Sequence, residues 1–362
     1  MTEHHRNIEA AIAAFARGEI VVVTDDNDRE NEGDLVMAAV HATPEKMAFI
    51  VRNTSGIVCT PLPLDHARRL RLDPMVSQND SPHHTAFTVS VDYAHGTTTG
   101  ISAEDRTATV RALANGNAGA NDFVRPGHVF PLIAKEGGVL MRSGHTEAAV
   151  DLCRLARLEP VGVICELVND DGSVMRGPQI IAFAETHKLH RVSVADLISY
   201  REAREKLVER VGEFPVASPI GTLQGFAFVT PFDPQHHMAF VHGKIGDGRN
   251  IPARLHRADV IGDVFGGAKT INATLARFKA EGRGVLVYLR DGTAGVPVTS
   301  IPRADQSSDA VRVQQWREIG LGAQILKDLG ISSIRLLASK KHTYVGLGGF
   351  GIEIVSTEAV EG

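Results

Sequence analysis

Short runs of β-branched residues alternate with helical segments over the first two hundred residues, and this alternation constrains the possible folds most. Residues Ile8 to Arg17 repeat apolar positions at helical spacing and end at Gly18, whereas Glu19 to Val23 form a short strand-like run. Glycine- and proline-marked turns, such as Pro126-Gly127 and Gly137-Gly138, separate the later runs. Helices and strands mixed in this way predict a layered α/β or α+β domain.

The composition changes near residue 201, where a connector and then a second domain are expected. Residues 201–215 hold eight charged residues among fifteen and predict a charged helix followed by Gly212 and Pro215. Strand-like runs resume at 223–229, 238–241 and 284–289, and a periodic helix covers 316–329. We therefore predict two domains, residues 1–205 and 215–362.

The overall composition excludes several classes of protein. Lys and Arg total 38 against 43 Asp and Glu, so the formal net charge of −5 gives no basic footprint for nucleic acid or an anionic membrane. Three cysteines are too few for a disulfide framework and fit a reducing compartment. The N-terminus shows no signal-peptide pattern, and no apolar run approaches the roughly 20 residues of a membrane-spanning helix. The sequence thus predicts a cytoplasmic protein without nucleic-acid or membrane partners.

An acidic segment runs from Asp25 to Asp34 and reads DDNDRENEGD, with six carboxylates and one arginine. Like charges at this density repel, and a hard cation such as Mg²⁺ relieves the repulsion through oxygen ligands. An EF-hand is excluded, because a loop starting at Asp28 places Ala39 where a bidentate glutamate is required. The segment therefore predicts either a metal or ligand site or a plain solvated loop.

Two later segments each carry a histidine after a glycine. His128 lies in RPGHVFPL (125–132), and His145 lies in RSGHTEAAVDL (142–152), where a helix is expected to begin. The free N–H groups of that helix start, its dipole and Arg142 together favour an anion, so a phosphorylated substrate is the natural ligand. Structural roles for both histidines, and helix capping by Thr146, are equally compatible with these patterns.

Glu166 ends a buried-looking strand, residues 161–165. A carboxylate at such a strand end often has a raised pKa and acts as an acid or base, although a surface charge fits equally well. Asp105 has a simpler explanation, because Ser102 and Asp105 match a capping box at the start of a helix that runs to Leu113.

Six segments occur in a characteristic order and together cover nearly all of residues 5–200. They are DDNDRENEGD (25–34), GIVCTPL (56–62), TTTGISAEDR (97–106), RPGHVFPL (125–132), RSGHTEAAVDL (142–152) and GVICELVNDDG (162–172). This set resembles the 3,4-dihydroxy-2-butanone 4-phosphate synthase family of riboflavin biosynthesis. The resemblance implies a homodimeric lyase that uses Mg²⁺ or Mn²⁺ and no organic cofactor. Its substrate would be D-ribulose 5-phosphate, and its products 3,4-dihydroxy-2-butanone 4-phosphate and formate.

The resemblance also implies roles for individual residues. Glu30 and His145 would hold the metal ion, and His128, Glu166 and Asp34 would be the catalytic residues. We expect Glu166 or Asp34 to remove the first proton, which creates an enediolate that a divalent ion stabilises. The substrate would be bound by Arg29, Glu30, Asp34, Thr99, Arg142, Ser143, Gly144, His145, Thr146 and Glu166. A non-catalytic phosphate- or cation-binding protein is the alternative from another class.

The second half carries two segments that resemble GTP cyclohydrolase II. They are RLHRADVIGDVF (254–265) and REIGLGAQILKDL (317–329), and the resemblance spans about residues 216–355. Members of that family bind Zn²⁺ through three cysteines and open the ring of GTP, so the resemblance makes a bifunctional enzyme possible.

Departures from that pattern argue against a second activity. The three cysteine positions hold Asp259, Thr270 and Asn272, and no cysteine follows Cys165. One carboxylate, one hydroxyl and one amide make a weak site for zinc. Gln315 also stands where the family has a catalytic aspartate. We therefore predict no zinc and no GTP hydrolysis, with the bifunctional enzyme as the alternative.

Overall fold

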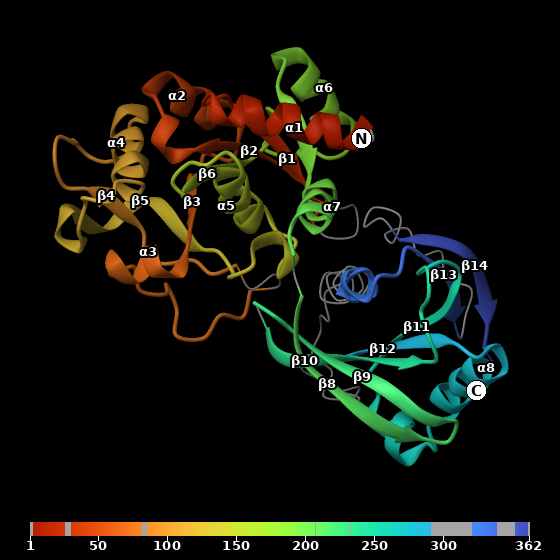
Figure 1. Ribbon diagram of the computed structural model, residues 1–362. Helices are drawn as coiled ribbons and strands as arrows, with labels where there is room; N and C mark the ends of the chain where they lie inside the picture. Colours follow the sequence, from red (N-terminus) through yellow and green to blue (C-terminus); the bar gives the residue numbers. More distant parts are fainter. Residues whose placement is uncertain are drawn as a thin grey trace. The chain divides into compact units, whose positions relative to one another are not determined.

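The computed structural model describes residues 3–25, 30–81, 85–206, 208–231, 233–290, 321–338 and 352–360. Arg29, Gln315 and the first part of the helix expected at 316–329 lie outside these residues. The chain divides into two compact units, with the change between Tyr200 and Arg201 (Figure 1). Each unit is built on a mixed seven-stranded sheet with helices packed against it, which confirms the predicted layered α/β class.

In the described residues of the first unit there are seven strands and seven helices. The strands are β1 (Val21–Thr24), β2 (Gly33–Ala38), β3 (Cys59–Leu62), β4 (Val91–Tyr93), β5 (Phe123–Ile133), β6 (Gly162–Glu166) and β7 (His190–Ser193). The helices are α1 (Glu3–Ala16), α2 (Pro44–Asn53), α3 (Leu64–Arg69), α4 (Ala103–Leu113), α5 (His145–Leu155), α6 (Pro178–His187) and α7 (Val194–Arg204). Three 3₁₀ turns are η1 (Ala39–His41), η2 (Ala120–Asp122) and η3 (Gly138–Leu140). The strand order is β4-β5-β3-β6-β2-β1-β7.

Both faces of the centre of this sheet are covered, because every residue of β2 is buried. On one face, Leu35 and Met37 join a core with residues of α2, α4 and α6, such as Met47 and Ile180. The alternate residues of β2 point to the other face, where α5 packs against β1, β2, β3 and β6. Asp34 therefore faces α5.

The turn predicted at Pro126-Gly127 is wrong. Both residues lie within β5, which pairs with β4 through a register shift between Val91 and Asp92. A side chain on Gly127 would overlap the backbone of Val91. The glycine is thus required by the close approach of two strands rather than by a turn.

The charged helix predicted over 201–215 is confirmed only for residues 201–204 and is wrong beyond them. Helix α7 ends at Arg204, and β8 (Glu209–Ser218) begins within the same charged stretch. Along β8 exposed residues alternate with half-buried ones, so Glu209 and Glu213 face solvent from an edge strand. The first charges of the stretch, up to Arg204, thus belong to a helix, and only Glu209, Arg210 and Glu213 belong to the strand.

The second unit has a sheet of order β14-β13-β11-β12-β10-β9-β8 with α8 against it. Its further elements are β9 (Gly221–Thr230), β10 (Asp233–His242), β11 (Ile251–Arg257), η4 (Ile261–Phe265), α8 (Lys269–Glu281), β12 (Gly284–Leu289), β13 (Ser333–Ala338) and β14 (Glu353–Ala359). Its core includes Leu223, Phe278 and Leu286. The strands expected at 223–229, 238–241 and 284–289 are confirmed, and residues 321–328 of the predicted helix are helical. Among the described helices, none has the length and hydropathy needed to cross a bilayer.

Candidate active site

Asp34 and Glu166 lie side by side at one edge of the first sheet. They are direct partners in the antiparallel pairing of β2 with β6. Directly opposed residues of neighbouring strands share a face, so both carboxylates point toward the side covered by α5. Glu166 is half-buried, whereas Asp34 is only 2% exposed.

The strand register places His128 in the same row. Cys59 of β3 is level with Ile164 of β6 and with Phe130 of β5. Glu166 and His128 each lie two residues from these partners and toward the same edge, because β5 runs parallel and β6 antiparallel to β3. Asp34 and Glu166 thus share one face of the sheet, and His128 lies toward the same end of its strands.

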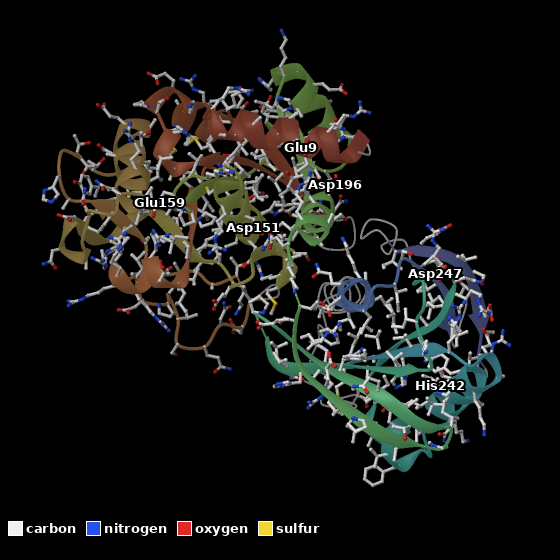
Figure 2. The ribbon with its side chains drawn as sticks, in the orientation of Figure 1. Glu9, Asp151, Glu159, Asp196, His242 and Asp247 are labelled. Carbon is white, nitrogen blue, oxygen red and sulfur yellow. The ribbon has the colours of Figure 1, made fainter. Side chains whose placement is uncertain are left out.

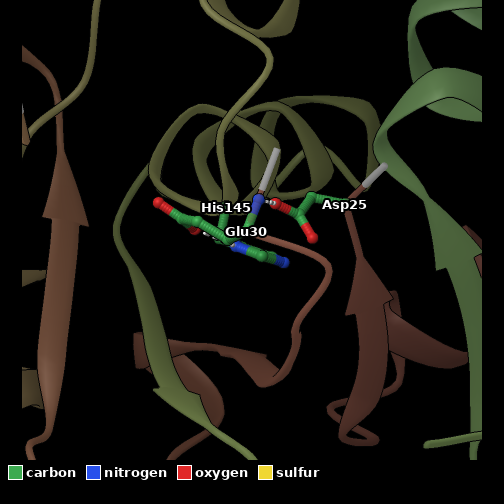
Figure 3. Close-up of side chains that lie close together, drawn as sticks. All are labelled: Asp25, Glu30 and His145. Carbon is green, nitrogen blue, oxygen red and sulfur yellow. Dashed lines mark hydrogen bonds and ion pairs between the residues drawn. The ribbon is translucent and has the colours of Figure 1, made fainter. Parts of the chain in front are cut away.

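Asp25, Glu30 and His145 form a cluster that can hold a metal ion (Figure 3). Each offers one ligand atom, and these atoms all lie within 4.8 Å of one another. Oε2 of Glu30 lies 3.7 Å from Nδ1 of His145. The two predicted metal ligands, 115 positions apart in the sequence, therefore meet within a single chain. Asp25 directly follows β1 and opens the acidic segment, but no local signal distinguishes it from the other carboxylates there.

Asp25 also closes the loop between β1 and β2. Its two carboxylate oxygens accept hydrogen bonds from the backbone N–H groups of Glu30 at 2.9 Å and of Glu32 at 2.8 Å. A backbone–backbone hydrogen bond, from the N–H of Asp25 to the carbonyl of Glu32, joins the same two segments. The carboxylate that begins the loop thereby fixes the backbone of Glu30 beside His145.

Burial raises the pKa of Asp34 to about 8, against the attraction of His145 and with help from the nearby carboxylates. Its Oδ1 atom lies 3.8 Å from Nδ1 of His145 and accepts no hydrogen bond from the described residues. Burial and the neighbouring charge of Glu30 also raise the pKa of Glu32. This edge therefore has an excess of negative charge and a buried oxygen without a donor, which a divalent cation would relieve.

His128 is oriented by an aspartate that the sequence analysis missed. Nδ1 of His128 lies 2.7 Å from Oδ2 of Asp92, and its backbone N–H donates to Oδ1 of Asp92 at 2.9 Å. The imidazole remains 41% exposed, so its other nitrogen can reach a ligand. A side chain on Gly100, whose φ is +92°, would overlap both members of this pair. Only pairing between β4 and β5 brings Asp92 here, so no local pattern signals it.

The loop that carries Thr99 is shaped by Asp105. Ser102 caps α4 by accepting from the N–H of Asp105 at 3.0 Å, as predicted. The carboxylate of Asp105, however, accepts from Oγ1 of Thr98 at 2.7 Å and from the N–H of Gly100 at 3.0 Å. Asp105 therefore holds the loop next to His128 instead of completing the predicted capping box.

Arg142 lies at the start of α5, as the predicted anion site requires. Its Nη1 lies 2.6 Å from Oε2 of the buried Glu147, and its Nη2 donates to Oγ1 of Thr85 at 3.0 Å. A side chain on Gly144 would overlap the guanidinium. The arginine is thus fixed in place, but Glu147 offsets part of its charge.

The first turn of α5 supplies the other groups of that site. Ser143 and Gly144 precede the helix, and His145 and Thr146 are its first two residues, both buried. Gly144 has no side chain to cap the helix, which suits an anion site at this helix start. Deeper in α5, Asp151 (Figure 2) accepts from the N–H of Val139 at 2.8 Å and ties the η3 turn to the helix.

Comparison with known proteins identifies both units. The profile of 3,4-dihydroxy-2-butanone 4-phosphate synthase matches residues 9–200, and that of GTP cyclohydrolase II matches residues 209–359. The chain belongs to the 3,4-dihydroxy-2-butanone 4-phosphate synthase family and carries a GTP cyclohydrolase II domain behind the synthase domain. Both resemblances found in the sequence are confirmed, and so is the expected enzyme class.

Individual relatives show the same organisation. The chain is 47% identical to the Bifunctional riboflavin biosynthesis protein RIBA 1, chloroplastic, of Arabidopsis thaliana, over 96% of this chain and 68% of that protein. RibBX from A. baumannii, solved as a two-domain 3,4-dihydroxy-2-butanone 4-phosphate synthase, is 36% identical with a TM-score of 0.82, covering 97% of this chain and 99% of its own. A 3,4-dihydroxy-2-butanone 4-phosphate synthase in complex with two magnesium ions is 47% identical, with a TM-score of 0.53, over 54% of this chain and 97% of its own.

Proposed function

We propose that the first unit converts D-ribulose 5-phosphate into 3,4-dihydroxy-2-butanone 4-phosphate and formate, with Mg²⁺ or Mn²⁺ held by Glu30 and His145. The observation that carries this proposal is the meeting of Asp25, Glu30 and His145 beside the Asp34–Glu166 pair. The magnesium ions named for a similar synthase structure support the choice of metal.

The donor set fits such an ion. Mg²⁺ binds through one or two carboxylates and keeps several waters, and Mn²⁺ also takes carboxylate and water oxygens. Asp25 and Glu30 supply the oxygens, and His145 supplies a nitrogen from a rigid helix start. When bound, the ion would stabilise the negative charge of an enediolate.

The carboxylates have different accessibilities and therefore different roles. Glu166 is half-buried at the strand edge and can reach a substrate, so we assign it the first proton abstraction, α to the carbonyl. Asp34 lies deeper and has a raised pKa, so it can hold or exchange a proton beside His145. His128, oriented by Asp92, is placed to donate the proton needed for loss of water.

The substrate phosphate would bind at the start of α5. Arg142, Ser143, Gly144 and Thr146 lie at the N-terminal end of that helix, where its dipole favours an anion. Binding there directs the sugar toward the metal cluster, because His145 belongs to both sites. We assign Thr99 to the sugar on the side of His128, and Arg29 to the substrate on the sequence resemblance alone.

Formate release from D-ribulose 5-phosphate with Mg²⁺ tests the proposal directly, with EDTA as the metal control. Glu166→Gln is expected to reduce kcat by about 10²- to 10⁴-fold, as removal of a general base does. Glu185→Gln on the exposed part of α6 is the matched control and should leave kcat unchanged. Near wild-type turnover of a folded Glu166→Gln variant would remove Glu166 from the mechanism.

We also propose that the second unit does not open GTP. The residues at the three cysteine positions of the family include Asp259, whose Oδ1 accepts from the N–H of Gly262 at 3.0 Å, and Asn272, whose Nδ2 donates to the carbonyl of Gly267 at 3.0 Å. These side chains are engaged locally, and a thiolate site cannot form without cysteines. The similar two-domain synthase RibBX is consistent with such a chain.

The name of the Arabidopsis relative favours the alternative, a bifunctional enzyme. Purified protein with added Zn²⁺ and GTP decides between them: formate release at enzyme-like rates would establish the second activity. The same preparation tests the expected homodimer by light scattering, and cell fractionation tests the expected cytoplasmic location.

A further inference from the structure

The turn at residues 54–57 lies against Glu166 and has no part in the function proposed above. The hydroxyl of Ser55 donates to Oε2 of Glu166 at 2.8 Å. The backbone N–H of Ser55 donates to the carbonyl oxygen of Glu166, also at 2.8 Å. One residue therefore holds both the carboxylate and the main chain of Glu166.

The Ser55 hydroxyl lies closest to Glu166, and Sγ of Cys165 is a more distant neighbour at 3.5 Å. The hydroxyl accepts a hydrogen bond from the N–H of Ile57 at 3.3 Å while it donates to Glu166. Within the described part of the chain, no other hydrogen bond reaches the carboxylate of Glu166, so Oε1 is left for a substrate proton. This division of the two oxygens is what a carboxylate base requires, with one oxygen fixed and one available.

Buried groups anchor the turn on both sides of Ser55. The hydroxyl of Thr54, 5% exposed, donates to the carbonyl of Ile50 at 2.6 Å. On the other side, Nη1 of Arg106 in α4 donates to the carbonyl of Gly56 at 3.0 Å. Arg106 is itself only 6% exposed, so a buried cation of α4 is committed to this turn.

We propose that Ser55 is a positioning residue that aims the carboxylate of Glu166 at the substrate. This inference rests on the proposed role of Glu166 as the base. Arg106 and Thr54 fix the backbone of the turn. Because its backbone is fixed, the hydroxyl of Ser55 holds the carboxylate of Glu166 in one orientation. Correct aim of a base matters in the transition state more than in substrate binding, so its loss appears in kcat.

The test compares three serine variants in formate release from D-ribulose 5-phosphate. Ser55→Ala is expected to lower kcat by about 10- to 30-fold with KM within about twofold, because only orientation is lost. Ser55→Thr keeps the hydroxyl and is expected to restore most of kcat. Ser356→Ala is the matched control, since Ser356 also donates to a glutamate, Oε1 of Glu358 at 3.3 Å, in the other unit.

A double mutant separates this inference from the proposed function. If Glu166→Gln retains the expected activity, about 10²- to 10⁴-fold below wild type, Ser55→Ala in that background is expected to cause no further loss of kcat, because both changes remove the same contribution. An inactive Glu166→Gln with a fully active Ser55→Ala would overturn the positioning role alone. An active Glu166→Gln would instead overturn the base assignment. Loss of kcat that Ser55→Thr does not restore, together with a lower melting temperature, would make the turn merely structural and also overturn the inference.

Discussion

Two buried histidines, His145 in the first unit and His256 in the second, have opposite surroundings. In the first unit, the charged groups around His145 repel one another, and Oδ1 of Asp34 is buried without a donor among the described residues. In the second unit, His256 lies 2.9 Å from Oδ1 of Asp263, and Tyr288 donates to Oδ2 of the same carboxylate at 2.7 Å.

This difference concerns whether a ligand is needed to complete the surroundings of each histidine. Burial lowers the pKa of His256 despite the nearby Asp263, so that imidazole is neutral and its network is closed by hydrogen bonds. A satisfied network stabilises a fold, whereas an unsatisfied and repulsive cluster is retained where a ligand completes it. The comparison therefore predicts that cations act on the first unit and not on the second.

Metal removal should have the largest effect. With EDTA, lyase activity is expected to fall to background and to return with Mg²⁺, because Asp25, Glu30 and His145 need an ion to act. Thermal unfolding of the second unit is expected to be unchanged by the chelator, and metal analysis should find no stoichiometric zinc. A chelator-sensitive second unit would contradict the distinction.

Matched histidine variants sharpen the comparison. His145→Asn is expected to lower kcat by about 10²- to 10³-fold and to weaken Mn²⁺ binding, since a ligand and the contact with Glu30 are lost. The control is His256→Asn, which removes a buried imidazole of the second unit and should leave lyase kinetics unchanged. Mn²⁺ affinity measured by electron paramagnetic resonance reports on the site independently of turnover. Equal loss of lyase activity in both variants would show that the second unit supports the reaction.

The metal-free first unit should lose stability as pH rises. The pKa of Asp34 is raised from 3.8 to about 8 in the folded state, so the folded protein binds more protons than the unfolded chain between these values. The contribution of Asp34 to the free energy of unfolding is therefore fully present below about pH 4 and is lost as the pH rises to about 8. We expect a loss of about 2 kcal/mol, because relaxation of the folded protein reduces the effect of the full pKa shift. Hydrogen exchange of β2 and β6 amides, corrected for intrinsic rates at pH 5 and 8, measures the change.

Two controls accompany that measurement. Asp34→Asn is expected to flatten the pH dependence, because no proton is then exchanged at this position. Saturating Mg²⁺ is expected to flatten it as well, since a cation favours the ionised carboxylate. A stability that rises from pH 5 to pH 8 in EDTA would contradict the raised pKa of Asp34.

Local sequence predicted the elements whose signals are local. Helix α5 begins at His145 because Gly144 interrupts the preceding chain and a helix-forming run follows, and both signals are visible in residues 142–152. The β6 strand was equally clear from its run of apolar residues. In contrast, the charged stretch at 201–215 has good helix formers throughout, and only the edge pairing of β8 with β9 makes its second part, from Glu209, a strand.

The residues of the site also fall into those that the sequence predicts and those that only strand pairing brings together. The meeting of Glu30 with His145 was expected from a family resemblance and not from spacing, because their 115-residue separation carries no geometric information. The sequence alone does not predict the roles of Asp92 and Ser55, because their partners, His128 and Glu166, lie on strands that are distant in the sequence. Such second partners are set by sheet register, which no single segment encodes.

The cysteines provide the smallest expected effect and the last test of the contrast. All three lie in the first unit, and burial raises the pKa of Cys153 to about 12 and that of Cys165 to about 11. Since the thiolate is the reactive form, alkylation of the folded protein by iodoacetamide at pH 8 should be at least about 10²-fold slower than in urea. Lyase activity is expected to be unchanged over that time, because the proposed mechanism uses neither the thiol of Cys153 nor that of Cys165. Rapid labelling of Cys165 would show that β6, the strand that carries Glu166, separates from its neighbours. The proposal that the carboxylate of Glu166 is held in a fixed orientation would then be wrong.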